Sequence, residues 1–422
     1  MLFVLCLSLS LVLIVIDKFA YKELCPGMIF TMFWVWQILF LIIGGYGFLL
    51  FKYTGVIYIL ICLFFFNLGP LSMASSKASF VMSERCEMIN FDEKRLVLVL
   101  SILIVLGFWK PMHTLLSHGF HLSNLLDFSS LLKINNTLAV SRYSGKLDDG
   151  GLFAQFLAIF SYSAPLIGGF IYPICSSSKN KIICYLSFLP LFFGGLTQGV
   201  KMGMIASVFL FCSGLIVSHI LLGNELKIKT RTLLYGCFSL LLLIAILLIS
   251  MMFRIGKFDV QTFSEVRGKF IAYAFGHLPA FDIWFDSLSW QPTSLTYGGK
   301  LFMGITNFLG IMKREQGLYH EFQLISIDGA ATNVYTLFRI LVDDFGVFLC
   351  PIFCFIMGVF IQNSYRKLLR LVNYKIYSTI CVAFLFFTFW SFATSVFVYT
   401  TFLVVFVLFF GVLSIGTKKV QI

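Results

Sequence analysis

Long apolar runs follow one another along almost the whole chain, separated by short segments that carry most of its lysines and arginines. Hydrophobic residues make up 59% of the 422 residues and charged residues only 12%, whereas a soluble domain contains about 25% charged residues. A helix needs about 20 apolar residues to cross a bilayer. The sequence therefore predicts an all-α polytopic membrane protein, folded as a single integral membrane domain over residues 1–422.

We expect about eleven membrane-spanning helices, within a range of roughly ten to twelve. The first run has no basic segment before it and no small-residue cleavage site, so we interpret it as a retained helix. The expected spans are 1–16, 27–51, 54–73, 96–110, 151–175, 182–198, 202–222, 232–253, 341–362, 376–392 and 394–415.

The segments between the spans alternate in charge density, which predicts their side of the membrane. One set is short and rich in Lys and Arg, and such loops stay in the cytoplasm. The other set includes two long segments, 110–150 and 254–333, which we place outside together with the amino terminus. We expect short amphipathic helices in both long loops. The net charge of +12 is spread over many loops, so we expect no nucleic-acid partner.

The second long loop holds the largest supply of ionisable side chains between two apolar spans. Chemistry in a membrane protein needs polar groups held beside lipid, so we take 254–340 as the candidate active site. The candidates for a general base in this region are His277, Asp282, His320, Glu321 and Asp328.

His277 is the first choice for the base because it can titrate near neutral pH. Apolar residues at helical spacing over 263–274 predict an amphipathic helix on the outer leaflet. Pro279 predicts that this helix breaks or restarts just after His277. The break would set His277 between Arg267 and Asp282.

Tyr335, Arg339 and Asp343 recur every four residues where the chain enters the next span. This spacing places them on one stripe of a helix. One interpretation is an Arg339–Asp343 ion pair that neutralises the helix end. The other, which we favour, is an arginine held by Asp343 and directed at an anion, because charges near hydrocarbon are costly.

Four arginines on the external side suit a lipid-linked phosphate or diphosphate, because guanidinium groups bind phosphate oxygens through two parallel hydrogen bonds. The expected diphosphate ligands are Arg142, Arg254, Arg267 and Arg339, with Tyr143, Lys201, Tyr335 and Asp343 in support. We also expect this site to contact membrane lipid.

The run from Thr332 through Arg339 to Gly346 resembles the signature of bacterial O-antigen polymerases, the Wzy-type oligosaccharide repeat-unit polymerases. The segments 139–145 and 273–281 are similar to parts of that family's two external loops. The resemblance covers about a quarter of the chain, and elsewhere only hydropathy agrees. Lys201 stands where the family pattern leads us to expect an arginine, so a phosphate contact there would be made by a point charge.

The resemblance implies an inner-membrane glycosyltransferase that acts on undecaprenyl-diphosphate-linked sugars at the periplasmic face. It would transfer the growing glycan to the next lipid-linked repeat unit, with a chain-length regulator protein as partner. Diphosphate leaves readily once its charge is neutralised. Neither long loop contains a metal-binding D-x-D motif, so we expect a metal-independent enzyme without a cofactor.

Two other functions remain open from the sequence. A lipid-linked oligosaccharide flippase would need two related helical bundles and no large external loop, and the sequence shows neither such a repeat nor such short loops. An O-antigen ligase, which transfers finished chains to the lipid A core, would share the loop architecture expected here.

Overall fold

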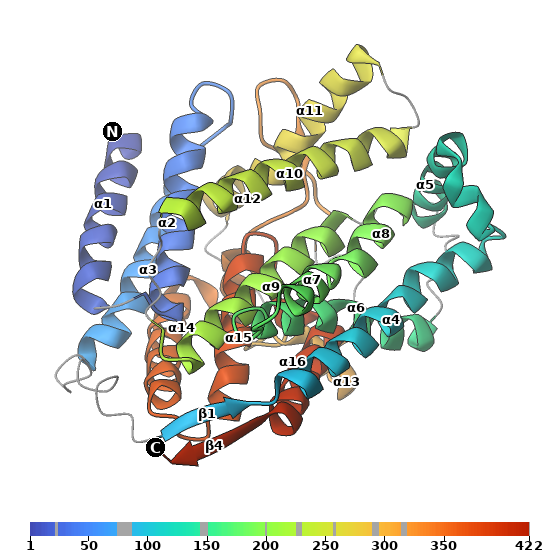
Figure 1. Cartoon of the computed structure of the whole chain (residues 1–422). Coiled ribbons are helices and arrows are strands. Elements are labelled where there is room, and N and C mark those ends of the chain that lie inside the picture. The colour runs from blue at the N-terminus through green and yellow to red at the C-terminus, as the bar shows by residue number, and fades with distance from the viewer. Residues whose placement is uncertain are drawn as a thin grey trace. The chain divides into compact units, whose positions relative to one another are not determined.

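The computed structural model describes residues 1–21, 24–73, 87–143, 151–198, 201–224, 230–255, 259–288, 295–313 and 319–421. Their regular structure is almost all helical (Figure 1). They form two compact units, and we describe each by itself. The first unit combines 1–86 with 269–403, and the second combines 87–268 with 404–422. The expectation of a single membrane domain stays a prediction.

The two units divide the helices and strands between them. The first unit contains α1 (Leu2–Ala20), α2 (Pro26–Gly44), α3 (Thr54–Ser72), α12 (His277–Asp286), α13 (Met303–Phe308), β2 (Gln323–Leu324), β3 (Ala331–Thr332), α14 (Leu337–Leu369), α15 (Tyr374–Trp390) and the 3-10 helix η3 (Val396–Val398). The second contains β1 (Glu87–Phe91), α4 (Glu93–Ser117), the 3-10 helix η2 (Leu122–Leu126), α5 (Phe128–Tyr143), α6 (Gly151–Ile171), α7 (Ser178–Leu186), α8 (Leu189–Gln198), α9 (Lys201–Leu221), α10 (Thr230–Ile255) and β4 (Thr417–Gln421). Helices α11 (Val260–Phe275) and α16 (Thr400–Gly416) run from one unit into the other.

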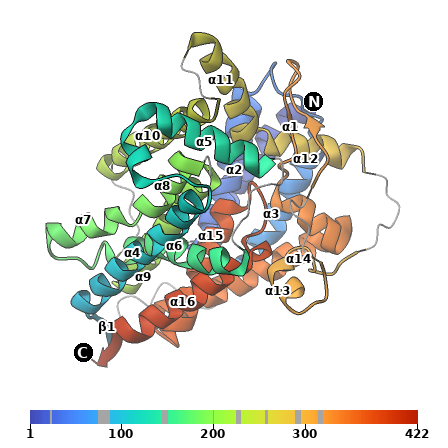
Figure 2. The same ribbon diagram turned by 90° about the vertical axis from the view of Figure 1, so that its right-hand side faces the viewer.

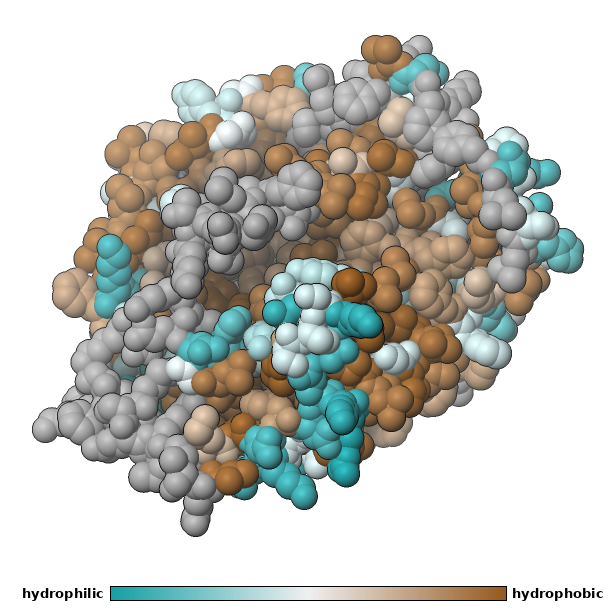
Figure 3. Space-filling view, in the orientation of Figure 1, coloured by the Kyte–Doolittle hydropathy of each residue, from teal (hydrophilic) through white to brown (hydrophobic). Residues whose placement is uncertain are grey.

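Apolar helices long enough to cross a membrane account for much of the chain. Among the described residues, eight segments meet the length and hydropathy of a span. They are Leu2–Phe19, Pro26–Gly44, Thr54–Ser72, Glu93–Ser117, Phe153–Ile171, Ser178–Gln198, Lys201–Leu221 and Leu337–Leu369. Hydrophobic side chains also cover much of the coloured surface in Figure 3. The helical membrane character expected from the sequence is confirmed.

The apolar run 27–51 was predicted as one span, but α2 ends at Gly44. The residues after it form a turn over 45–48, and the chain then runs extended and pairs with the segment following β2. Leu49 bridges Ser326, and the Leu50 amide donates to the Ile325 carbonyl at 2.9 Å. Apolar composition alone does not distinguish this extended piece from a continued helix.

In the first unit, α3 and α14 pack side by side, as Figures 1 and 2 both show. Small residues bring the two backbones together. A Cβ atom placed on Gly358 would lie 2.1 Å from the Phe66 carbonyl oxygen, and one on Gly69 would lie 2.7 Å from the Val359 nitrogen. Glycine at both positions therefore permits a contact typical of membrane helices.

Helix α14 contains two interruptions of its hydrogen-bond ladder. Gly346 has φ 71° and ψ 172°, so the helix kinks there. Pro351 has no N–H, which removes the ordinary helical donor to the Val347 carbonyl four residues earlier. The Tyr58 hydroxyl from α3 donates to that carbonyl at 2.8 Å. The neighbouring helix thus satisfies the group that proline leaves unpaired.

Tyr58→Phe should lower the stability of the protein by about 1–2 kcal/mol, because the Val347 carbonyl loses its donor. Thermal unfolding in detergent would measure the loss. Tyr46→Phe is the matched control, since Tyr46 is exposed. Equal unfolding midpoints for the two variants would contradict this role for Tyr58.

The second unit has its own close helix contact and a short sheet. A Cβ atom on Gly169 of α6 would lie 2.0 Å from the Phe211 carbonyl oxygen of α9. Glycine at this position therefore permits close approach of the two helix backbones. Strands β1 and β4 pair antiparallel, with Ile89 opposite Lys419.

Candidate functional site

The site forms where the chain enters α14, and all of its described contacts lie within the first unit. Thr336 precedes the helix with extended backbone, and Arg339 lies in the first turn. The Arg339 side chain is only 6% exposed. A guanidinium stays charged at every relevant pH, so its burial needs compensating contacts.

Three aromatic rings enclose the Arg339 guanidinium. Its central carbon lies 3.8 Å from the ring centre of Tyr319, 4.0 Å from that of Tyr335 and 4.7 Å from that of Trp284. Ring faces attract cations, and they do so more strongly where water is excluded. The rings stabilise the positive charge but accept no hydrogen bond from the guanidinium N–H groups.

The hydrogen bonds of Arg339 are incomplete among the described residues. Its Nη2 donates to the Glu321 carboxylate at 2.8 Å, and the Glu321 side chain is 73% exposed. The buried Nε and Nη1 atoms have no hydrogen-bond partner in this part of the chain. Buried donors are rarely left unpaired, so the guanidinium is equipped to accept an additional anionic ligand.

The predicted contact between Arg339 and Asp343 is wrong. Asp343 instead forms an ion pair with the Lys300 ammonium at 2.8 Å and accepts a hydrogen bond from the Tyr319 hydroxyl at 2.9 Å. Burial, together with the Asp343 charge, raises the pKa of Tyr319 well above 10, so this hydroxyl stays protonated and donates. Tyr319 therefore lies between the two oppositely charged side chains of the stripe.

Asp344, which the sequence reading did not select, fixes the loop that carries Lys300. Its carboxylate accepts hydrogen bonds from the Thr296 hydroxyl and from the amides of Lys300 at 3.0 Å and Leu301 at 2.7 Å. Its carbonyl accepts from the Tyr297 amide at 2.9 Å. The buried Asp344 thus fixes the loop through hydrogen bonds from one loop side chain and from three loop backbone amides. Its position beside Asp343 gave no sign of this role.

His277 lies at the predicted break, since α11 ends at Phe275 and α12 begins at His277. Its expected titration near neutrality is wrong. The ring is buried against Phe392, its Nε2 lies 2.7 Å from the Gln37 side-chain oxygen, and burial lowers its pKa to about 3. The ring is therefore neutral at physiological pH and donates to Gln37.

The depressed pKa of His277 predicts acid sensitivity. Below the ordinary pKa of 6.5, His277 is protonated in the unfolded chain but stays neutral in the folded protein. The free energy of unfolding therefore falls as pH drops from 6.5 toward 3. The loss should be roughly 1.4 kcal/mol per pH unit from this group. Thermal unfolding at several pH values should show a shallower decline for His277→Gln than for the wild type. The exposed His320→Gln variant should keep the wild-type slope; equal slopes in all three proteins would contradict the assignment.

Asp282, another predicted base, is also buried, and its carboxylate is fully engaged. It accepts from the amides of Lys52 and Tyr53 at 2.6 and 2.7 Å, and from those of Gly55 and Val56 at 2.8 and 3.1 Å. Burial raises its pKa, and these four bonds oppose that shift. The carboxylate caps the N-terminus of α3, which is a structural role.

The remaining base candidates differ from these two in exposure. Glu321, His320 and Asp328 are exposed. Of the three, Glu321 contacts Arg339, and its backbone carbonyl accepts from the Tyr335 hydroxyl at 3.2 Å. Among the described candidates, Glu321 therefore combines access to water with a direct contact to the buried cation.

The other predicted phosphate ligands belong to the second unit. Arg142 and Tyr143 end α5, Arg254 lies near the end of α10, and Arg267 lies in α11. Their side chains lie outside the described part of the structure, so a shared arginine cluster stays a prediction. Lys201 is the first residue of α9 and is half-exposed.

Three cysteines meet between α3 and α14. Two of them, Cys350 and Cys354, lie four residues apart on α14. Cys62 joins them, and their sulfur atoms lie within 4.8 Å of one another. All three are buried. Thiols can pack in such a place as small apolar groups, whereas thiolates would bring uncompensated charge into it. We therefore interpret the three cysteines as packed, uncharged thiols.

Comparison with known proteins adds no family assignment. No protein-family model, no curated protein and no solved structure matches the chain. A functional interpretation therefore depends on the chemistry around Arg339 and on the sequence motifs.

Proposed function

We propose that this chain polymerises lipid-linked oligosaccharide repeat units at the periplasmic face of the bacterial inner membrane. The observation that carries the proposal is Arg339: a buried cation at the entry of a membrane span, with two nitrogens unpaired among the described residues. A diphosphate offers oxygens for both nitrogens. The resemblance of residues 332–346 to O-antigen polymerases supports the same ligand.

In the proposed reaction, the hydroxyl of an incoming repeat unit attacks the anomeric carbon that carries the diphosphate. The new glycosidic C–O bond forms while the bond to the diphosphate oxygen breaks, and undecaprenyl diphosphate leaves. Arg339 would neutralise the charge that develops on the leaving group. Its low exposure strengthens that interaction, because little water screens it.

Glu321 is the proposed general base, in place of His277. Its carboxylate pairs with the Nη2 edge of the Arg339 guanidinium at 2.8 Å. A diphosphate that binds Arg339 would compete with this contact and release Glu321 to accept the proton of the acceptor hydroxyl. The exposed position of Glu321 supports both movements, because a solvated carboxylate loses little on leaving an ion pair.

The proposed membrane topology keeps eleven spans. The eight long segments would be joined by three shorter apolar helices, Leu241–Met252, Tyr374–Trp390 and Thr400–Gly416. Reporter fusions after Gly150 and Gln291 should report the periplasm, and a fusion after Lys229 the cytoplasm. A cytoplasmic signal at Gln291 would place the Arg339 region on the wrong side for this reaction.

Lipopolysaccharide banding tests the function directly. A strain that lacks this chain should lose the ladder and keep a single repeat unit attached to the core, and the wild-type gene should restore the ladder. Loss of every attached unit would instead indicate a ligase or a flippase. A chain-length regulator is the proposed protein partner, and a changed ladder length in its absence would support that interaction.

A further inference from the structure

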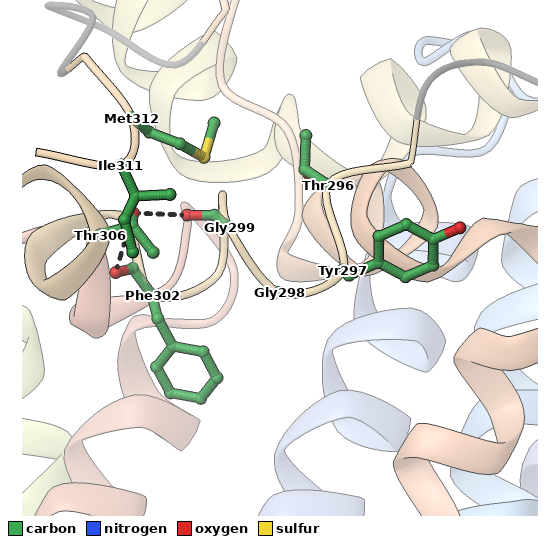
Figure 4. A pocket seen from close by; sticks show the side chains of 8 residues that line it. All are labelled: Thr296, Tyr297, Gly298, Gly299, Phe302, Thr306, Ile311 and Met312. Atoms are coloured by element: carbon green, nitrogen blue, oxygen red, sulfur yellow. Dashed lines mark hydrogen bonds between the residues drawn. The ribbon is translucent and has the colours of Figure 1, made fainter.

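An apolar groove lies in the same loop that presents Lys300 to Asp343. It has a volume of about 490 Å³ and is lined by residues of the segment 296–312 (Figure 4). The Phe302, Ile311 and Met312 side chains form much of its wall. The Thr306 hydroxyl donates within the loop, to the Gly299 carbonyl at 3.1 Å, so the lining presents little free polar surface. A mostly apolar lining with few polar groups is common among ligand-binding sites.

The groove is held open by contacts outside it. Asp344 binds the loop at Thr296, Lys300 and Leu301, as described above, and the Ser395 hydroxyl donates to the Leu301 carbonyl at 3.0 Å. A wall fixed in this way is formed before any ligand arrives, so binding loses little conformational entropy.

The rim of the groove exposes large apolar side chains. Tyr297 is 74% exposed and Ile311 is 69% exposed, and Phe308 of the neighbouring helix α13 is 79% exposed. They belong to a loop and a short helix outside the eight long spans. A concentration of such side chains around a cavity marks a surface that binds an apolar ligand.

Cationic groups lie next to this apolar surface. Lys300 is part of the groove segment, and its ammonium lies 5.9 Å from the ring centre of Tyr319. The same ring lies 3.8 Å from the Arg339 guanidinium. Through Lys300 and Tyr319, the loop that forms the groove therefore adjoins the buried arginine, an arrangement that complements a molecule with an anionic head and an apolar chain.

We propose that the 296–312 groove binds the isoprenoid chain of the lipid-linked diphosphate whose head group Arg339 binds. The identity of the head group rests on the proposed function. The groove contributes affinity through burial of the chain, and Arg339 contributes it through charge. The diphosphate head group and the isoprenoid chain are then bound by separate residues. A substitution can therefore weaken binding of one part of the ligand without affecting the other.

Binding of three probes to the protein in phosphatidylcholine nanodiscs distinguishes recognition of the head group from recognition of the chain. The probes are inorganic diphosphate, geranyl diphosphate and the longer farnesyl diphosphate, with binding to empty nanodiscs subtracted. Wild-type protein should bind farnesyl diphosphate at least about tenfold more tightly than inorganic diphosphate, with geranyl diphosphate in between. The double variant Ile311→Asn with Met312→Asn should lose this dependence on chain length and keep its affinity for inorganic diphosphate.

Ile327→Asn is the matched control, because Ile327 is also 69% exposed and lies outside the groove. An equal loss in this control, a chain-length dependence unchanged in the groove variant, or equal competition by phosphatidylglycerol would overturn the proposal. Absence of wild-type binding to all three probes would overturn it as well. If the chain-length dependence depends on the groove while the deletion strain keeps its ladder, the groove assignment stands and the polymerase function falls.

Discussion

Arg339→Ala should abolish long glycan chains and weaken binding of inorganic diphosphate by about 100-fold or more, because it removes the donors of a desolvated, charge-assisted contact. Arg339→Lys keeps the charge but loses the planar pair of donors, so it should recover activity only in part. The lipopolysaccharide ladder reports activity, and titration of the purified protein reports binding.

The Ala variant should still reach the membrane, because the partner it leaves behind, Glu321, is 73% exposed and solvated. Arg370→Ala is the control: it removes the same charge from an exposed position at the far end of α14. It should leave both the ladder and diphosphate binding unchanged.

Glu321→Gln distinguishes a ligand-binding arginine from a structural ion pair. If Glu321 competes with the ligand for Arg339, its neutralisation should raise affinity for inorganic diphosphate while lowering chain synthesis. Opposite signs for binding and activity are not expected from simple loss of fold. Unchanged diphosphate affinity in Glu321→Gln and Arg339→Ala would reduce their contact to a structural ion pair.

The sequence identified the helices better than the contacts of the site. The apolar run 54–73 predicted α3 almost to the residue, because a predominantly apolar segment of this length has few alternatives to a helix in a bilayer. The run 27–51 failed at its end, where Leu49 pairs with Ser326 far along the chain. Hydropathy does not record a long-range backbone pairing of this kind.

The helical spacing correctly placed Arg339 and Asp343 at a polar helix entry, but Tyr335 lies outside the helix, because α14 begins at Leu337. Helical spacing also predicts contacts only between residues of the same helix. The actual partners of Arg339 and Asp343 are Glu321 and Lys300, which come from irregular segments. Such segments have no repeat from which a contact can be derived. His277 failed for a related reason, because burial, which sets its pKa, depends on tertiary packing.

Asp282→Asn should cost about 3–5 kcal/mol of stability, because a buried carboxylate that serves four backbone N–H groups is replaced by a side chain with a single acceptor oxygen. The new amide would direct its own N–H groups toward donors at the start of α3. The fit is also close: a Cβ atom on Gly55 would lie 2.7 Å from the Asp282 Cα, so the helix end has little room to shift.

Asp286→Asn provides the matched control for this change. Asp286 lies one turn further along α12 and accepts from the Thr54 hydroxyl at 3.1 Å in an exposed position, so its replacement should cost less than about 1 kcal/mol. Thermal unfolding in detergent, with activity per folded molecule measured in parallel, separates the two roles of Asp282. A variant at Asp282 that unfolds like the wild type and yet makes no glycan would return this carboxylate to the list of catalytic bases. Loss of folded protein with normal activity in the remainder is the result that a helix cap requires.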